Sequence, residues 1–395
     1  RKLNIDRVSP TITDIRIANS GSSNSVSILN TPTYQYFSNT NSQITVSAND
    51  DQSGISAIDY QFVTEGGVVN ENSWTTSTFT DFVNPRSYTF NAQPTIANVD
   101  ASFVGKVYLR VKDGAGNEVR SSVALNGKYV DENIKPTVSA MTPVTAGINL
   151  TQWQTGVSFN LSAADAESGL DRIEVYNNDT LVKTVTISPL ASGLGPQTYN
   201  TAALTPSSQY QYTASTPGQY DVYIKAFDKS GNMLKSSTQN VKICNAVPIL
   251  NVTPDTGTWT NNNIVLTLSN TESNVKSAVT YYYQKTGETA WTAISTVPPN
   301  ASTTFTLSQS ENTIYTFKAV TESGKESLPV TKSIKIDKDA PKMATVQTKI
   351  PSTGAVDTPN GKNGWYTETP TIEITPANQT NELSPVTTKY RFGLS

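Results

Sequence analysis

The chain has 395 residues, with 29 basic and 32 acidic side chains, a net charge of −3 and no histidine. This length is enough for several domains of ~100–150 residues. The charges are spread evenly and form no basic stripe, so nucleic acid and anionic membranes are excluded as expected partners. No apolar run approaches the ~20 residues that span a bilayer, so no membrane span is expected within this sequence.

The residue types also exclude several kinds of catalysis. Without histidine there is no Ser-His or Cys-His pair and no imidazole base. Cys244 is the only cysteine, so an internal disulfide is excluded, as are zinc sites built from cysteine and histidine. The acidic residues recur at turns rather than forming one distinctive pair. We therefore expect a protein that is not an enzyme and has no organic cofactor.

Two motifs recur at one spacing and indicate a duplicated domain. The segment Ala48–Ile55 aligns without a gap with Ala163–Leu170, 115 residues later. The segment Val107–Asn117 aligns with Val222–Asn232 at the same offset, and both segments end in Asp-x-x-Gly-Asn. Tandem modules of ~100 residues that are rich in short strands are typically β-sandwiches.

The expected module boundaries share a pattern in which an apolar residue is followed by a polar residue and then a proline. Proline fixes φ and favours an extended residue before it, which suits a short, stiff joint. The joints are Ile5-Asp6-x3-Pro10, Val130-Asp131-x4-Pro136, Ile336-Asp337-x3-Pro341 and the weaker Ile243-Cys244-Asn245-x2-Pro248. They divide the chain into module 1 (residues 6–130), module 2 (131–244), module 3 (245–336) and an incomplete module 4 (337–395).

Within each module the elements follow one order. An alternating strand comes first, as in residues 44–48, 157–163, 264–268 and 372–374. A tight turn follows, in which Gly54 and Gly169 supply a positive φ; Asn274 replaces them in module 3 and is expected to adopt the same left-handed conformation. Further strands bring the total to about seven in each module. The predicted fold class is therefore all-β, with no helix.

These residues resemble the bacterial immunoglobulin-like (Ig-like) repeats of secreted and cell-surface proteins. Module 2 carries most of the family pattern. Its matching residues are Asp131, Pro136, Trp153, Asp165, Ser168, Gly169, Tyr220, Asp228, Gly231 and Asn232. Modules 1 and 3 lack parts of the pattern, and module 4 keeps Asp337, Pro341 and Trp365. The resemblance implies tandem Ig-like β-sandwich domains arranged end to end as an elongated rod.

The resemblance implies a non-enzymatic stalk of a large bacterial cell-surface protein: an adhesin, a surface fibre or a cell-wall or S-layer-associated protein. Accessory modules of a secreted carbohydrate-active enzyme, or a virion or phage appendage, remain as alternatives. The expected location is extracellular, and the expected partners are neighbouring domains and a host or cell-wall glycan or protein. For glycan stacking, the candidates are Tyr281-Tyr282-Tyr283 and Tyr34-x-Tyr36-Phe37. The chain is expected to be a fragment of a longer polypeptide.

The acidic turns are the only candidate metal sites. Calcium is a hard cation that takes oxygen ligands, and the turns contain Asp50, Asp51, Asp165, Glu167, Asp113 and Asp228. The predicted site lies at the joint between modules 1 and 2. Its candidate ligands are Asp131, Glu132, and Asp228 or Asp113. The alternative is that these residues only cap turns by bonding the backbone, and their loss in module 3 argues against an obligate ion at every joint.

Overall fold

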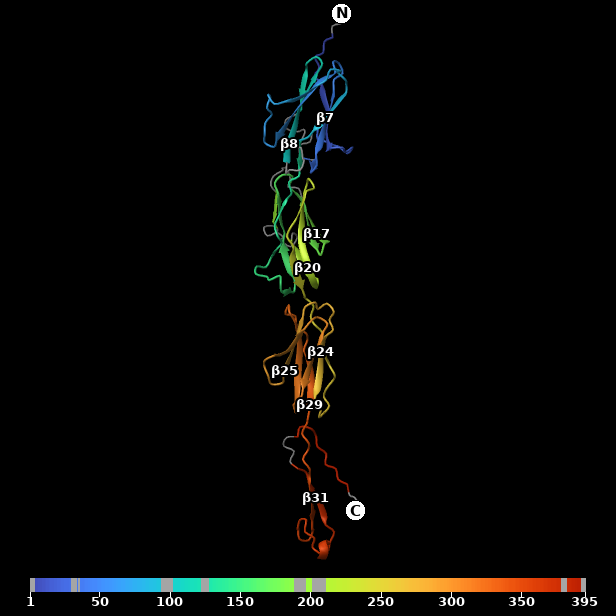
Figure 1. Ribbon diagram of the computed structural model, residues 1–395, viewed down its shortest axis with the longest axis vertical. Coiled ribbons are helices and arrows are strands. Elements are labelled where there is room, and N and C mark those ends of the chain that lie inside the picture. The colour runs from blue at the N-terminus through green and yellow to red at the C-terminus, as the bar shows by residue number, and fades with distance from the viewer. Residues whose placement is uncertain are drawn as a thin grey trace. The chain divides into compact units, whose positions relative to one another are not determined.

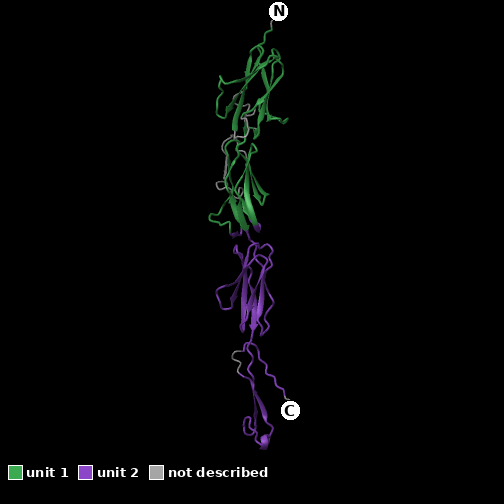
Figure 2. Ribbon diagram, in the orientation of Figure 1, with its two compact units in different colours: residues 1–151, 156–214, 219–242 green, residues 152–155, 215–218, 243–395 purple. Residues whose placement is uncertain are grey.

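The computed structural model describes residues 4–29, 34, 36–93, 102–121, 128–187, 197–200, 211–377 and 382–391. These residues form β-strands and one short 3-10 helix, with no α-helix among them, so the all-β prediction is confirmed. The described part contains no helix that is long and apolar enough to cross a membrane. Contacts divide the chain into two compact units, which are coloured separately in Figure 2.

In the first unit, the residues of module 1, together with Asp131 and Glu132, form two facing sheets, marked by β7 and β8 in Figure 1. One sheet has the order β2-β1-β4-β7; the other has the order β3-β10-β8-β5-β6, with β9 beside β8. The strands are β1 (Thr11–Asn19), β2 (Val26–Ser27), β3 (Phe37–Ser38), β4 (Ser42–Asn49), β5 (Ile55–Thr64), β6 (Thr75–Thr78), β7 (Arg86–Asn91), β8 (Ser102–Asp113), β9 (Glu118–Arg120) and β10 (Lys128–Glu132).

Alternation along these strands builds the core of module 1. In β4, the apolar residues Ile44, Val46 and Ala48 are fully buried and alternate with partly exposed polar residues. They join a cluster to which the facing sheet contributes Leu109 and Tyr129. Burial of one face on each sheet gives a β-sandwich-like arrangement.

The residues of module 2 repeat this plan within the first unit. Two short sheets have the orders β11-β15-β18 and β12-β14-β19, and a larger sheet contains β22-β20-β16-β17 with β21 beside β20. Phe159 and Ile224 are fully buried. The strands are β11 (Thr137–Val138), β12 (Thr142–Pro143), β14 (Val157–Asn160), β15 (Ser162–Asp165), β16 (Leu170–Asn177), β17 (Thr180–Thr186), β18 (Gln197–Asn200), β19 (Tyr212–Ala214), β20 (Gly218–Asp228), β21 (Met233–Lys235) and β22 (Gln239–Ile243).

The second unit contains the residues of modules 3 and 4 together with residues 152–155, 215–218, 243 and 244 of module 2. Its sheets have the orders β23-β24-β27, β26-β25-β28-β29 and β30-β31. Tyr281 and Phe317 are fully buried in one cluster with Cys244. The elements are β13 (Trp153–Gln154), β23 (Leu250–Thr253), β24 (Ile264–Asn270), β25 (Val279–Lys285), β26 (Thr292–Val297), β27 (Ser302–Leu307), β28 (Glu311–Thr321), β29 (Val330–Ile336), β30 (Thr345–Lys349), the 3-10 helix η2 (Lys362–Gly364) and β31 (Thr371–Thr375).

The turn after the first long strand differs between modules. Gly54 and Gly169 have φ values of +70° and +79°, and β5 and β16 begin directly after them. The prediction for Asn274 is wrong, because its φ is not positive. In module 3 the strand β25 begins only at Val279, so the chain makes a longer connection that does not need a left-handed residue.

Candidate metal centre

The first unit contains two groups of three closely spaced carboxylates. In each group, every residue places one carboxylate oxygen within 4.8 Å of those of the other two. The first group, cluster 1, is Asp6, Asp50 and Asp113; the second group, cluster 2, is Glu132, Asp165 and Asp228. The three residues of cluster 2 are the last residues of β10, β15 and β20. Strand ends therefore bring together residues that are far apart in the sequence.

Asp165 and Asp228 each cap the turn that follows their strand. Asp165 Oδ1 accepts a hydrogen bond from the backbone N–H of Gly169 at 2.6 Å. Asp228 Oδ1 accepts one from the backbone N–H of Asn232 at 2.8 Å. Such capping is the ordinary role of aspartate in turns. It occupies one oxygen of each carboxylate with backbone donors.

Glu132 is the last residue of β10, the last strand of module 1, and it contacts the loops of module 2. Its Oε1 accepts a hydrogen bond from the Ser168 hydroxyl at 2.9 Å, and its Oε2 accepts one from the backbone N–H of Ile134 at 2.7 Å. The side-chain amide of Asn232 donates to the Glu132 carbonyl at 3.2 Å and to Asp228 Oδ2 at 2.9 Å. Asp228 and Asn232, the first and last residues of the Asp-x-x-Gly-Asn motif, therefore close the turn after β20. Asn232 also binds the end of β10, the last strand of module 1, to this turn.

Cluster 2 concentrates negative charge away from water. Glu132 is 0% exposed, Asp228 2% and Asp165 3%. Among the described residues no lysine or arginine forms an ion pair with any of the three. Burial, aided by the neighbouring Asp228 carboxylate, raises the pKa of Glu132 to about 7. Burial is also the main cause that raises the pKa of Asp228 to about 6 and the pKa of Asp165 above its ordinary value.

One oxygen in cluster 2 lacks a partner. Asp165 Oδ2 is buried and accepts no hydrogen bond. A buried acceptor without a partner destabilises the fold by roughly 1–3 kcal/mol, and by more when the group is charged. Because Oδ1 already binds the turn backbone, Oδ2 is the Asp165 oxygen that is available to an additional ligand.

Cluster 1 has the same plan in a more open setting. Asp50 Oδ1 accepts three backbone N–H groups, and Asp113 Oδ1 accepts that of Asn117 at 2.8 Å. The Asn117 amide donates to Asp113 Oδ2 at 2.7 Å and to the Asp6 carbonyl at 3.4 Å. Unlike the residues of cluster 2, Asp6 is only partly buried. Asp6 lines a cavity of about 640 Å³.

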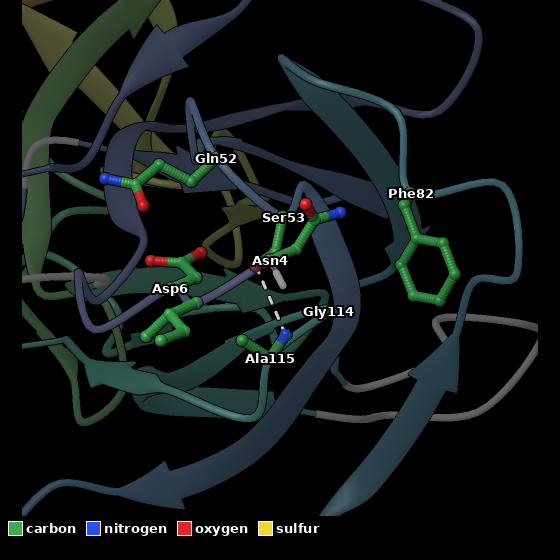
Figure 3. A pocket seen from close by; sticks show the side chains of 8 residues that line it. Asn4, Asp6, Gln52, Ser53, Phe82, Gly114 and Ala115 are labelled. Carbon is green, nitrogen blue, oxygen red and sulfur yellow. Dashed lines mark hydrogen bonds between the residues drawn. The ribbon is translucent and has the colours of Figure 1, made fainter. Parts of the chain in front are cut away.

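Figure 3 shows the walls of this cavity. Asp6 lies beside Ser53, and Ala115 donates its backbone N–H to the Ser53 hydroxyl at 3.2 Å. Phe82 closes another side, and Asn4 and Gln52 add polar groups. The cavity is therefore a polar recess at the end of module 1, and Asp6 is the residue of cluster 1 that lines it.

Module 3 carries neutral side chains at the equivalent strand ends, although Glu272 Oε1 accepts the backbone N–H of Asn274 within the first turn. Asn270 is the last residue of β24, and its Oδ1 accepts the backbone N–H of Glu272 at 3.2 Å. Thr321 is the last residue of β28, and its Oγ1 accepts the backbone N–H of Lys325 at 2.9 Å. The Ser323 hydroxyl donates to the Cys244 carbonyl. Neutral side chains therefore perform the same capping and fastening.

The structure separates the four residues that the sequence placed in one site. Glu132 and Asp228 lie together in cluster 2, whereas Asp113 lies in cluster 1, at the other end of module 1. Asp131 belongs to neither group. It is fully buried at the β10 register position opposite Phe103 of β8 and beside Ser38 of β3, and burial raises its pKa to about 7.

Asp6, Asp50 and Asp165 were not among the residues predicted for the joint site. The sequence does contain a pattern that could have predicted these clusters. When the four joints are aligned on their prolines, the residue four positions before the proline is the equivalent one in each joint. These residues are Asp6, Glu132, Cys244 and Asp337. Aligning on the aspartate instead pairs Asp6 with Asp131, which lies on the other face of β10.

The tyrosines of β25 suggested for glycan stacking are largely engaged in the fold. Tyr281 is fully buried in the core of module 3. The Tyr283 ring lies 4.7 Å from that of Phe305. Tyr282 lies on the opposite face of β25, beside Lys318. Two of the three rings are therefore explained by packing within the module.

Comparisons with known proteins add little to this geometry. No protein-family model and no curated protein matches the chain. One solved structure that resembles it is the crystal structure of dimeric latent PorU from Porphyromonas gingivalis, at 9% sequence identity and a TM-score of 0.21. The match covers 83% of this chain and 34% of the PorU chain, so this chain spans about a third of that protein. A likeness this low carries no argument about function.

Proposed function

We propose that this chain is a non-enzymatic stalk segment of a large bacterial surface protein, built of Ig-like β-sandwiches joined end to end. The observation that carries the proposal is a fastening contact that recurs at the start of three modules. In modules 1 and 2 an asparagine amide donates to the carbonyl of the residue four positions before the proline, as Asn117 does to Asp6 and Asn232 to Glu132. In module 3 the Ser323 hydroxyl donates to Cys244.

A repeated fastening contact suits a spacer better than a catalyst. A hydrogen bond between the last strand of one module and a turn of the next restricts bending at the joint. Proline just after it restricts the backbone further. Module 4 begins in a related way, because Asp337 Oδ2 accepts the backbone N–H groups of Leu383 at 3.1 Å and Ser384 at 2.8 Å. We propose that the function of this segment is to hold a binding region at a distance from the cell.

Small-angle scattering of the whole chain tests the mechanical part of this proposal. A compact body of 395 residues has a radius of gyration of about 21 Å, and we expect at least twice that value together with the scattering profile of a folded protein. A folded chain with a radius near the compact value would contradict the stalk. Antibodies against the chain should label intact cells; labelling only after lysis would contradict a surface location.

A further inference from the structure

We propose that Glu132, Asp165 and Asp228 bind a calcium ion at the joint between modules 1 and 2. The first argument is geometric. Two oxygens that bind one calcium ion at about 2.4 Å lie at most about 4.8 Å apart. The three carboxylates of cluster 2 each offer an oxygen within 4.8 Å of the others, which is the span of a single coordination sphere.

The second argument is the unpartnered oxygen. Asp165 is 3% exposed, and its Oδ2 accepts no hydrogen bond. Every other carboxylate oxygen of the cluster accepts a hydrogen bond, from Gly169 for Asp165 Oδ1 and from Ser168, Ile134 or Asn232 for the oxygens of Glu132 and Asp228. A cation bound at Asp165 Oδ2 would satisfy this acceptor, and the remaining lone pairs of Glu132 and Asp228 would complete its carboxylate ligands.

The third argument is charge. Unpaired buried carboxylates are costly, and three within one coordination sphere repel one another. Module 3 shows that the strand-end positions do not require this charge, because Asn270 and Thr321 cap the equivalent turns from those positions with neutral oxygens. The negative charge in module 2 therefore exceeds what capping needs. A divalent cation balances most of it.

The ligand set identifies the ion class. All three ligands are hard carboxylate oxygens, and the nearby Ser168 hydroxyl supplies another oxygen. Hard oxygen ligands favour calcium or magnesium over zinc or copper. Calcium accepts irregular geometry and six to eight ligands, whereas magnesium requires a nearly ideal octahedron. The carboxylates of cluster 2 are held at the ends of three separate strands, an arrangement that is not built around a regular octahedron. They therefore fit calcium better than magnesium.

Calorimetric titration of the whole, EGTA-stripped chain with calcium chloride tests the site. The key variant is Asp165→Asn, whose amide oxygen still accepts the Gly169 N–H, as Asn270 accepts its turn N–H in module 3. The wild-type chain should bind one calcium ion more than this variant. Any ion bound at cluster 1 is common to both chains and cancels in the difference. Parallel melting curves should show that calcium raises the melting temperature of the wild type more than that of the variant.

Asp171→Asn is the matched control, because Asp171 lies in the same module but its side chain is 45% exposed and pairs with Arg172. It should bind as many calcium ions as the wild type. If Asp165→Asn does not fold, Glu132→Gln replaces it, since the amide oxygen still accepts a hydrogen bond. Equal calcium stoichiometry in the wild type and in the folded cluster variant, or no binding to either, would overturn the proposal. Equal affinity for magnesium chloride would overturn the assignment to calcium, for which we expect roughly tenfold preference or more.

Discussion

Modules 2 and 3 end equivalent strands with different side chains. In module 2 the ends of β15 and β20 carry Asp165 and Asp228; in module 3 the ends of β24 and β28 carry Asn270 and Thr321. Both pairs accept backbone N–H groups of the turns that follow. The comparison teaches that the residue at the strand end needs an oxygen acceptor but not a charge. The carboxylates of module 2 therefore require a second explanation, and cation binding supplies one.

The largest expected effect concerns the turn itself. A Cβ added at Gly54 would lie 2.0 Å from the carbonyl oxygen of Phe82, and φ there is +70°. Gly54→Ala should therefore lower the free energy of unfolding by about 3 kcal/mol or more, from the clash and the left-handed backbone together. Chemical denaturation of the whole chain measures this change.

Two further variants separate the causes. Gly66 also has a positive φ, of +77°, but no atom lies within 4 Å of the added Cβ, so Gly66→Ala should cost only about 1 kcal/mol. Asn274→Ala should cost less still, because this residue in module 3 does not adopt a positive φ. Equal losses at Gly54 and Asn274 would show that the two turns do not differ in the way described.

The next effect comes from introducing the charges of module 2 into module 3. Asn270 is 8% and Thr321 3% exposed, so the double variant Asn270→Asp/Thr321→Asp buries two carboxylates with no cation near them. We expect a loss of about 2–3 kcal/mol in EGTA. Calcium should restore part of the loss. Denaturation curves in EGTA that match the wild type would show that this position tolerates charge without a ligand.

A smaller effect is expected at the fastening contact. Asn232→Ala removes the amide that donates to the Glu132 carbonyl and to Asp228 Oδ2, and we expect a loss of about 1–2 kcal/mol. The equivalent residue in module 3 is Lys325, whose backbone alone is used in the turn. Lys325→Ala should change stability by less than about 0.5 kcal/mol. A larger loss for Lys325→Ala than for Asn232→Ala would contradict the role given to the motif.

Sequence patterns predicted the strands well because the fold depends on alternation. Ile44, Val46 and Ala48 face the core for the same reason that they alternate in the sequence. The grouping of acids was harder to predict, because Asp50 and Asp113 come together only when β4 and β8, from different sheets, end at the same edge of the sandwich. No pattern within a short stretch of the sequence indicates how close Asp50 and Asp113 lie.

Asp131 shows a further limit. It is adjacent to Glu132, and both are fully buried acids, so composition does not distinguish them. They differ because successive side chains of a strand point to opposite faces. Glu132 lies four residues before Pro136, and Asp6, Cys244 and Asp337 lie four residues before the prolines of their own joints. Only this shared spacing distinguishes Glu132 from Asp131. The strands could be predicted from the periodicity of the apolar residues. The acidic cluster could not, because it depends on which face of the strand each acid occupies.

Hydrogen exchange of the whole chain, measured in calcium and in EGTA, compares the two modules in one sample. If cluster 2 binds calcium, the amides of Gly169 and Asn232, which donate to Asp165 and Asp228, should exchange more slowly in calcium, by roughly tenfold or more. The amide of Lys325, which donates to Thr321, should exchange at the same rate in both conditions. Unchanged exchange at Gly169 and Asn232, or equal slowing in module 3, would contradict a calcium site built by the carboxylates of module 2.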